Sequence, residues 1–361
     1  MNLTFAVLYG LSALSLALSA LNFFTVRRIS TSMAVISESV VILIPMRNEE
    51  SNVDGVLTAA LASIGLEDFK VFALDDSSTD QTSKLLNQHK EEITILQGKE
   101  LASGWLGKPF ACHQLSQASV ADYLVFIDAD VRLEPSAVSS AIAAMKAHQW
   151  DFLSPYPKQL GQTFLMKLIQ PLLQWSWLTS VPLRFAERGL VNSMIVANGQ
   201  FFIVRRAAYE AIAGHESVKA EVLEDLSLAR TLNVQGYSGA VAEASSVATC
   251  AMYETNKQLI DGYTKSLWKA FGSPVGTVFT VALLLLTQVA PITLFFCGYT
   301  AAIVPFLAVA MTHLLASRRT RSSVLNVFAH PIAALALIAL ICESWRRKSR
   351  GQLVWRGRRV S

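Results

Sequence analysis

The sequence predicts an α/β fold in which a doubly wound, mostly parallel sheet is flanked by apolar segments at both ends of the chain. In the central region, apolar strand-like runs alternate with helix-like segments, which is typical of parallel sheets with right-handed crossovers. Several of these runs end in acidic or polar residues. The two ends of the chain contain uncharged stretches long enough to span a bilayer.

The composition agrees with a protein that is partly embedded in a membrane. The chain has 361 residues, enough for one large or two ordinary domains, and it is 52% hydrophobic but only 16% charged. The four Cys residues lack metal-type spacing, so reduced packing residues are expected. Much of the net charge of +4 falls after Ala316. That asymmetry is a membrane-topology signal, and no nucleic-acid partner is expected.

The first segment, Asn2 to Val26, carries no charged side chain and is followed by Arg27 and Arg28. A cleaved signal peptide is the alternative, but it would have a basic start, a shorter apolar core and a small-x-small cleavage site. We therefore expect a retained transmembrane anchor over residues 1–28. The positive-inside rule places the residues that follow it in the cytoplasm.

The central region is expected to alternate between buried strands and capped helices. In order, the expected elements are a strand over 37–46, a helix over 49–63, a strand over 69–76, a helix to about 89, a strand over 93–96, a helix over 108–118, a strand over 123–127, a helix from after Pro135 to about 148, and a strand over 150–153. Ser and Thr residues after the second strand, and acidic residues at the first helix start, suit helix N-termini.

The strand Tyr123–Ile127 has the pattern of a strand buried on both faces, and it is followed at once by Asp128 and Asp130. Ligands of open α/β sheets bind beyond such strand tips. Two carboxylates there are costly unless a cation joins them, and a divalent metal with a phosphate-bearing substrate meets that need. A turn or helix cap is the structural alternative, because Asp-x-Asp alone is a weak motif. Since the first two strands also end in polar or acidic residues, the tips together predict a site.

Several common enzyme classes have no support in the sequence. No G-x-G-x-x-G follows the first strand and no G-x-x-x-x-G-K-[ST] occurs, which disfavours dinucleotide dehydrogenases and P-loop NTPases. Neither H-E-x-x-H nor G-x-S-x-G is present, so zinc peptidases and serine hydrolases are disfavoured as well.

Three later segments have features of membrane contact or of a functional site. Thr163–Leu178 is apolar with two Trp residues and is divided by Pro171, so it is either a core helix or a helix in the membrane interface. Residues 196–205 predict a loop entering a strand, with Gly199 allowing close backbone approach. Glu224 and Asp225 begin an amphipathic helix, either as ordinary surface acids or as a general base that faces the site.

The C-terminal region predicts at least two membrane spans. No Asp, Glu, Lys or Arg occurs between Lys269 and Arg318, which suits two spans with a turn near Gly298. A third apolar segment, 324–342, contains Pro331. If that segment crossed the bilayer, it would export the basic residues at 346–350, against the positive-inside rule. Either it is re-entrant or interfacial, or one of the preceding segments is not a span.

Taken together, the motifs resemble the membrane-anchored family-2 glycosyltransferases with a GT-A fold. Within that family they most resemble the carotenoid- and hopanoid-associated branch, of which the 4,4'-diaponeurosporenoate glycosyltransferases are one group. The matching motifs are IPMRNEE at 44–50, LDDSSTDQT at 74–82, GWLGKPFA at 104–111, IDAD at 127–130, ANGQF at 197–201, GH at 214–215, ED at 224–225 and VWRGR at 354–358. The resemblance runs from about 40 to 272 and recurs at the tail.

The resemblance implies a Rossmann-like GT-A domain that catalyses an inverting, metal-dependent transfer of one sugar from a nucleotide-sugar. A UDP-sugar is the expected donor, and a membrane lipid, a carotenoid acid or a related isoprenoid, is the expected acceptor. Polyprenyl phosphate and hopanoid acceptors are alternatives, as are a nucleotidyl- or phosphotransferase of similar fold and a non-catalytic scaffold. The Q-x-x-R-W motif of processive members is missing, with Lys265–Lys269 in that region, which favours transfer of a single sugar.

The resemblance also implies roles for particular residues. Asp225, with Glu224, would act on the acceptor, and Asp130 and Asp128 would hold Mg²⁺ or Mn²⁺. Residues expected to contact the nucleotide-sugar are Pro45, Arg47, Glu49, Asp75, Asp76, Lys108, Asp128, Gly199 and Gln200. If the acceptor is already anionic, Asp225 matters less as a base.

The implied organisation has four parts. They are a transmembrane anchor over 1–28, a GT-A domain over 38–272, a membrane region of two to three helices over 273–345, and a basic tail over 346–361. The protein is expected to be a multi-pass protein of the cell (inner) membrane with a cytoplasmic catalytic domain.

Overall fold

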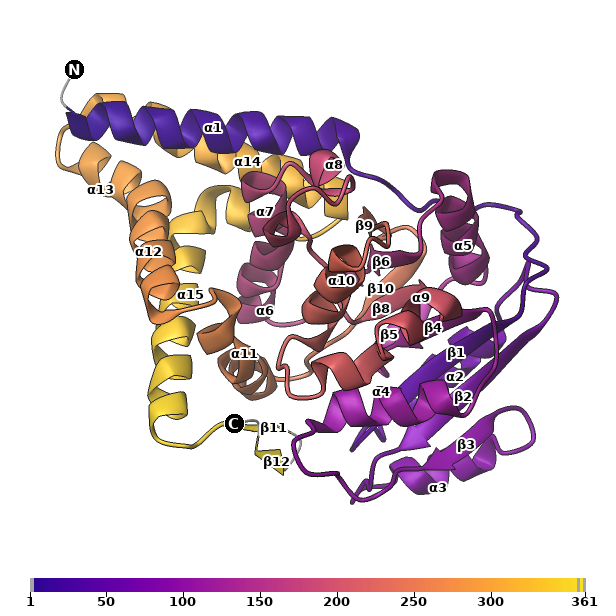
Figure 1. The fold of residues 1–361 in the computed structure, drawn as a ribbon. Coiled ribbons are helices and arrows are strands. Elements are labelled where there is room, and N and C mark those ends of the chain that lie inside the picture. The colour runs from indigo at the N-terminus through magenta and orange to yellow at the C-terminus, as the bar shows by residue number, and fades with distance from the viewer. Residues whose placement is uncertain (1–2, 356–357, 360–361) are drawn as a thin grey trace. The chain divides into compact units, whose positions relative to one another are not determined.

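The computed structural model describes residues 3–355 and 358–359, and its contacts divide the chain into two compact units (Figure 1). The sheet unit comprises Arg27–Lys158 and Phe185–Met252. The described residues of the helical unit lie within Met1–Val26, Gln159–Arg184 and Tyr253–Ser361. Part of the tail motif at 354–358 and of the basic tail at 346–361 falls outside the described residues.

The sheet unit is built on a mixed, mostly parallel sheet with the strand order β3-β2-β1-β4-β8-β6-β9. Its strands are β1 (Val40–Met46), β2 (Phe69–Asp75), β3 (Thr94–Gln97), β4 (Tyr123–Ile127), β6 (Phe152–Tyr156), β8 (Phe201–Arg205) and β9 (Gly239–Glu243). β1 pairs in parallel with β2 and β4, and β6 with β9, whereas β8 is antiparallel to its neighbours β4 and β6. The expected α/β class with a mostly parallel sheet is confirmed.

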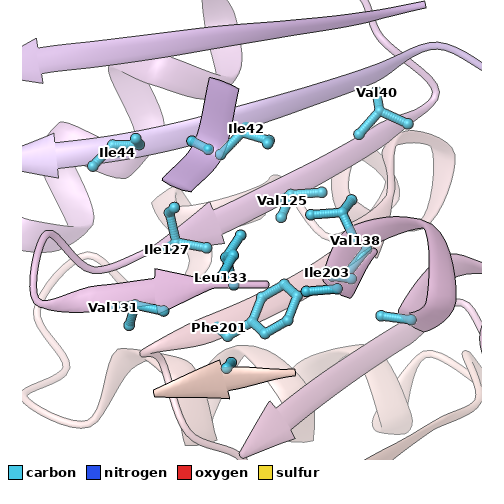
Figure 2. Close-up of a cluster of buried hydrophobic side chains, with 14 of the residues drawn as sticks. Val40, Ile42, Ile44, Val125, Ile127, Val131, Leu133, Val138, Phe201 and Ile203 are labelled. Carbon is cyan, nitrogen blue, oxygen red and sulfur yellow. The ribbon is translucent and has the colours of Figure 1, made fainter. Parts of the chain in front are cut away.

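Strand alternation gives the sheet two apolar faces. Val40, Ile42 and Ile44 of β1 point to one face, where they pack with Val125 and Ile127 of β4 (Figure 2). Residues of β5 (Val131–Leu133) and β8, and Val138 of a covering helix, belong to the same cluster. Val41 and Leu43 point to the other face and join a separate buried cluster. Each of these side chains contributes about 1.5–3 kcal/mol when fully buried. Because both faces are covered, the strands read as continuous apolar runs in the sequence.

Helices cover both faces of this sheet. They are α2 (Val53–Leu61), α3 (Thr82–Gln88), α4 (Gly107–Gln117), α5 (Ala137–His148), α9 (Arg206–Ala211) and α10 (Glu224–Val234), with short 3₁₀ turns η1 (Asn192–Met194) and η2 (Gly214–Val218). Residues of α2, α3 and α5 belong to the cluster with Ile42. Residues of α4, α9 and α10 belong to the cluster with Leu43.

The expected helix over 49–63 begins later than the sequence pattern suggests, at Val53. The backbone N–H of Glu49 donates to Thr82 Oγ1 at 2.8 Å, and that of Glu50 donates to Asp80 Oδ2 at 3.1 Å. Since the first residue of α3 and the loop before it supply these partners, the chain remains a loop through residues 47–52. Two short strands were also not expected from the sequence: β5 (Val131–Leu133) pairs antiparallel with β10 (Ala248–Cys250).

The helical unit contains the apolar segments. Its helices are α1 (Leu3–Thr25), α6 (Phe164–Ile169), α7 (Pro171–Ser180), α11 (Asn256–Ala270), α12 (Pro274–Leu284), the π-helical turn η3 (Leu285–Val289), α13 (Ala290–Phe296), the 3₁₀ turn η4 (Thr300–Ala302), α14 (Ile303–Thr320) and α15 (Asn326–Ser349). Small elements remain at the unit boundary and in the tail: α8 (Leu183–Ala186), β7 (Lys158–Gln159), β11 (Val354–Trp355) and β12 (Arg358–Arg359).

Within the described part of the chain, four helices are long and apolar enough to cross a membrane. They are Phe5–Thr25, Pro274–Phe296, Thr300–Thr320 and Asn326–Ser349. The turn expected near Gly298 is present, and Gly298 has a φ of +93°, which favours glycine. The expected N- and C-terminal apolar helices are therefore confirmed, including the third C-terminal one that the charge pattern left open.

The packing places two segments of the expected 38–272 domain in the helical unit, namely residues 159–184 and 253–272. Pro171 begins α7, which explains the division of the Thr163–Leu178 segment. Trp175 is buried, donates from Nε1 to Thr312 Oγ1 at 2.8 Å, and stacks on His313 with ring centroids 4.5 Å apart. The core interpretation thus describes this face of the segment, whereas Phe164 is 61% exposed.

Candidate functional site

The Asp-x-Asp motif forms a tight turn at the end of β4, which is buried along its whole length. The backbone N–H of Asp128 donates to the carbonyl of Gln200 at 3.0 Å, and the carbonyl of Asp128 accepts from Val131 N at 3.1 Å. Because β8 is antiparallel to β4, Ile127 pairs with Phe201. The loop that precedes β8 is therefore held beside Asp128.

One carboxylate oxygen of Asp130 is suited to bind a cation. Its Oδ1 atom is buried and has no hydrogen-bond partner among the residues that the structure describes. The pKa of Asp130 is raised to about 7. Burial is the main cause, and the nearby charges of Asp128 and Glu49 add to it, whereas a hydrogen bond from Cys250 lowers the pKa by less. A divalent metal would supply the missing partner, so the residues present fit such an ion.

The carboxylates of Asp128 and Asp130 alone would leave the coordination of a divalent metal incomplete. No cluster of three or more His, Cys, Asp or Glu side chains suited to a metal occurs in the described residues. Mg²⁺ and ions like it are often held by one or two carboxylates together with substrate phosphates and waters. Asp128 and Asp130 suit that arrangement, in which a substrate phosphate and waters complete the coordination.

Lys108, in the first turn of α4, links the strand tip to the start of α10. Its Nζ atom lies 2.7 Å from Asp128 Oδ1 and 3.2 Å from Glu224 Oε1. Burial lowers the pKa of Lys108, but the charges of Asp128 and Glu224 outweigh it and hold that pKa well above its ordinary value. Lys108 is thus a permanent cation between the two acidic motifs.

Asp225 is fixed by two backbone N–H groups. Its Oδ2 atom accepts from Gly199 N, and its Oδ1 atom accepts from Leu226 N at 2.8 Å. Burial raises the pKa of Asp225 to about 6, and the charge of Glu224 adds to this effect. A carboxylate with a pKa close to neutrality is well suited to take up a proton near physiological pH.

The loop at residues 197–200 is locked by its own hydrogen bonds. Ser154 Oγ donates to the carbonyl of Asn198 at 3.0 Å and accepts from Asn198 N at 2.7 Å, while Asn198 Oδ1 accepts from Gln200 N at 2.8 Å. A Cβ at Gly199 would lie 3.1 Å from Asp225 Cβ and 3.2 Å from Lys108 Nζ. Glycine therefore lets this backbone approach the carboxylate and the ammonium group.

These residues surround one pocket in the sheet unit. The predicted site residues that line it are Pro45, Lys108, Asp128, Gly199, Glu224 and Asp225. The other lining residues are Cys112, Phe126, Ile127, Phe202, His215 and Leu228. The tips of β1 and β4, the start of α4 and the start of α10 thus meet at one cavity.

The remaining predicted residues lie at the tips of β1 and β2. Arg47 Nη1 donates to the carbonyls of Asp76 and Ser77, and Asp75 Oδ1 accepts from Ser78 N at 3.0 Å. Asp75 and Asp76 are both buried, and Asp75 holds the turn between β2 and α3. These residues connect the tips of β1 and β2, and they are not among the residues that line the pocket.

Two further predicted residues, Glu49 and Gln200, lie close to the Asp-x-Asp turn. Glu49 Oε2 accepts from Asn52 Nδ2 at 2.9 Å, and the charge of Glu49 contributes to the raised pKa of Asp130. Gln200 is buried, and its carbonyl accepts the N–H of Asp128. Gln200 therefore supports the Asp-x-Asp turn through its backbone.

His215 is a pocket residue to which the sequence interpretation gave no role. Its Nδ1 lies 2.8 Å from Tyr209 Oη, and its ring meets Phe126 edge-on with centroids 4.9 Å apart. Burial lowers the pKa of His215 to about 3, so the imidazole is neutral at physiological pH. The residue before it must be glycine, because a Cβ at position 214 would lie 2.2 Å from the Tyr209 ring. The Gly-His pair was visible in the sequence as a motif, but nothing there indicated that it faces the pocket.

The fold and the site together define a GT-A glycosyltransferase. A mostly parallel sheet ends in an Asp-x-Asp turn, and a second acidic pair at a helix start faces it across a lysine. Comparison with known proteins agrees with this class. The model of the Glycosyl transferase family 2 family matches residues 41–213, and the chain is a glycosyltransferase that carries a domain of this family.

Curated relatives and one solved structure extend the comparison. The 4,4'-diaponeurosporenoate glycosyltransferase of Staphylococcus haemolyticus is 25% identical over 266 residues, covering 72% of this chain and 68% of the relative. That of Staphylococcus aureus strain bovine RF122 is 24% identical over 338 residues, covering 90% and 88%. The mannosyltransferase PcManGT of Pyrobaculum calidifontis, solved with GDP-Man and Mn²⁺, has the same fold, with a TM-score of 0.56, 14% identity and 96% coverage of both chains.

The close approach of Gly199 to Asp225 predicts that Gly199→Ala impairs catalysis without unfolding the protein. The added methyl group would push apart Asp225 and Lys108, and kcat/KM should fall on the order of 10- to 100-fold. The matched control is Gly10→Ala in α1, where a Cβ meets no described atom within 4 Å. Sugar-transfer rates and thermal unfolding of both variants are the measurements. Wild-type kcat/KM in Gly199→Ala would contradict the assigned geometry.

Proposed function

We propose that this protein transfers a single sugar from a nucleotide-sugar to a lipid in the membrane, with inversion at the anomeric carbon. The observation that carries this proposal is the Lys108 bridge, which joins Asp128 on the Asp-x-Asp side to Glu224 on the other side of one pocket. Donor-side and acceptor-side groups are thereby held within reach of the same reacting centre. The relatives are 4,4'-diaponeurosporenoate glycosyltransferases, which supports an isoprenoid acid as acceptor.

On the donor side, Asp130 and Asp128 would hold a divalent cation, Mg²⁺ or Mn²⁺. Such a cation supplies positive charge to the diphosphate, which leaves with developing negative charge. Lys108 adds a permanent cation beside Asp128 and suits contact with a phosphate. The nucleoside would be bound at the tips of β1 and β2, by Arg47, Glu49, Asp75 and Asp76. The expected nucleotide is UDP.

On the acceptor side, Asp225 would act as the base, with Glu224 beside it. The acceptor oxygen attacks the anomeric carbon and the bond from that carbon to the diphosphate oxygen breaks. If the acceptor is a hydroxyl group, Asp225 takes its proton. Its two backbone hydrogen bonds hold the carboxylate in place for this step. A carboxylic acid or phosphate acceptor is already ionised near neutral pH, and Asp225 then matters less as a base. Gln200 and Gly199 would position the sugar through the locked loop.

The membrane placement follows from the charge pattern. Four helices of the described chain are long and apolar enough to span a bilayer, and Arg27-Arg28 follow the first of them. By the positive-inside rule the sheet unit faces the cytoplasm, where nucleotide-sugars are made, as a multi-pass protein of the cell membrane. The acceptor is a carotenoid acid or related isoprenoid, with polyprenyl phosphate and hopanoids next in order.

A labelled donor tests the reaction class and the acceptor class together. Purified enzyme receives UDP-sugar labelled in both sugar and nucleotide, with a long-chain isoprenoid acid or a truncated acid of the same head group. We expect only the sugar label in the lipid product, and a higher kcat/KM for the long chain. A lipid that also carries the nucleotide label would establish nucleotidyl transfer instead. Equal kcat/KM for both acceptors would refute the lipid acceptor.

Asp130→Asn should lower the transfer rate at least ~100-fold, because one electrostatic stabiliser of the leaving group is lost while the shape is kept. Removing divalent ions with EDTA should abolish activity, and Mg²⁺ or Mn²⁺ should restore it in the wild type only. Asp68→Asn, at an exposed position of the sheet unit, is the matched control. Full activity in EDTA or in the Asp130 variant would disprove the metal requirement.

With a hydroxyl acceptor, the raised pKa of Asp225 predicts an acidic limb in the pH profile. A base with a pKa of about 6 is mostly ionised above pH 7, and protonation lowers kcat/KM roughly tenfold by pH 5. The profile is measured at saturating metal ion, because a bound cation lowers the pKa of Asp130 out of this range. Asp225→Asn should leave a weak activity that lacks this limb. A limb that persists unchanged in the variant would mean that another group, such as the acceptor, is titrating.

A further inference from the structure

The side chain of Arg132 reaches back to the Asp-x-Asp turn that precedes it. Arg132 lies in the middle of β5, two residues after Asp130. Its Nη1 atom donates to the carbonyl of Ala129 at 2.8 Å and to that of Val131 at 2.9 Å. Ala129 is the middle residue of the motif, between Asp128 and Asp130. The guanidinium group therefore holds the backbone of the turn at its centre.

The rest of the turn is held by backbone groups. The carbonyls of the two aspartates accept N–H groups of Val131 and Ala251, each at 3.1 Å. The carbonyl of Ala129, by contrast, accepts from the side chain of Arg132. None of the four hydrogen bonds of the guanidinium group uses the Asp130 carboxylate, whose Oδ1 atom has no partner among the described residues. The direction of this carboxylate thus depends on the backbone that Arg132 holds.

Asn52 holds the other side of the guanidinium group. Nη2 of Arg132 donates to Asn52 Oδ1 at 3.0 Å, and Asn52 Nδ2 donates to Glu49 Oε2 at 2.9 Å. Asn52 occupies the N-cap position of α2, where an Asn side chain usually accepts from the first backbone N–H groups of the helix. Among the described residues it makes no such bond. The side chain that could cap α2 instead connects Glu49 with the Asp-x-Asp turn through Arg132.

Helix α2 leaves room for the guanidinium group at Gly55. A Cβ atom at this position would lie 2.5 Å from Arg132 Nε and 2.9 Å from Arg132 Cζ. Glycine is less favourable than alanine in a helix, so the helix alone gives no reason for it here. Two features of α2 that are unfavourable for the helix, the uncapped start at Asn52 and Gly55, are therefore both explained by the placement of Arg132.

We propose that Arg132 is a positioning residue, which orients the Asp-x-Asp turn for the divalent cation and is itself held by Asn52. The inference rests on the proposed function, because the cation is the one that Asp128 and Asp130 would hold. Arginine suits this role since its planar fork of N–H donors reaches two carbonyls and an amide oxygen at once, whereas lysine has a single nitrogen. Its replacement should weaken binding of the cation more than it slows transfer at saturating cation.

Binding of Mn²⁺ to the purified full-length chain tests this role separately from catalysis. Electron paramagnetic resonance measures free Mn²⁺ with saturating UDP or GDP, and sugar transfer at saturating Mn²⁺ gives kcat. Arg132→Lys keeps the charge but removes the fork, and Asn52→Ala removes its support. The matched control is Arg206→Lys, because Arg206 Nε also donates to a backbone carbonyl, that of Ala121, at 2.7 Å. If Arg132→Lys unfolds at a lower temperature than the wild type, Asn52→Ala decides alone.

We expect the Kd for Mn²⁺ to rise on the order of tenfold in Arg132→Lys and in Asn52→Ala, with kcat at saturating Mn²⁺ within about threefold of the wild type. The double variant should bind Mn²⁺ about as weakly as Arg132→Lys, since both replacements break one chain of contacts. Arg206→Lys should bind like the wild type. Wild-type Mn²⁺ affinity in the Arg132 and Asn52 variants would overturn the proposal, and fully additive effects would remove Asn52 from it.

The same measurements separate this inference from the proposed function. A wild type that binds Mn²⁺ but transfers no sugar would refute the proposed function, while weaker binding by the Arg132 variant would still support the positioning role. A wild type that binds no Mn²⁺ with either nucleotide would overturn both the metal requirement and the role of Arg132.

Discussion

The ammonium group of Lys108 is the interaction on which the pocket depends. Asp128 lies at a strand tip and Glu224 at a helix start almost a hundred residues later, and both carboxylates meet the same Nζ atom, at 2.7 and 3.2 Å. Without this cation the fold would bring like charges together in a partly buried cavity, which is costly. Even with it, burial raises the pKa values of Asp130 and Asp225 to about 7 and 6. The site is therefore prepared for a cationic ligand on one side and for proton uptake on the other.

The direction of one strand makes this arrangement possible. Strand β8 runs antiparallel to β4, so the loop at 197–200 arrives beside Asp128 instead of at the opposite edge of the sheet. That loop is pinned by Ser154 and Asn198, and its glycine donates to Asp225. A backbone amide thus orients the proposed base, and the same loop carries the carbonyl that holds the Asp-x-Asp turn. Donor side and acceptor side are coupled through a few residues of rigid backbone.

The helical unit has more than an anchoring role in the proposed function. An enzyme that acts on a lipid must receive the head group while the apolar tail stays in the membrane, since each CH₂ drawn into water costs roughly 0.8 kcal/mol. The four helices of the described chain that are long and apolar enough to span a bilayer would keep that tail in the lipid beside them. The buried Trp175 links α7 to α14, so the segment that interrupts the sheet unit in sequence is a structural part of the helical unit.

Much of the fold was predictable from the sequence because its signals are local. The apolar runs of β1, β2 and β4, the acidic pairs that follow them, and the uncharged helices are all visible within short windows. The class of fold was therefore predicted, and half of the residues that line the pocket, including Asp128, Gly199 and Asp225, were among the predicted site residues.

What the sequence could not determine are relations between residues far apart in the chain. The antiparallel direction of β8, the short β5–β10 pair, the neutral His215 in the pocket and the delayed start of α2 all arise from long-range hydrogen bonds and burial. The packing of α15 is the clearest case. Composition gives a helix long enough to span, but only the tertiary structure brings its first turn to α6 and its last turns to α11, because hydropathy measures transfer into an apolar phase and carries no information about packing partners.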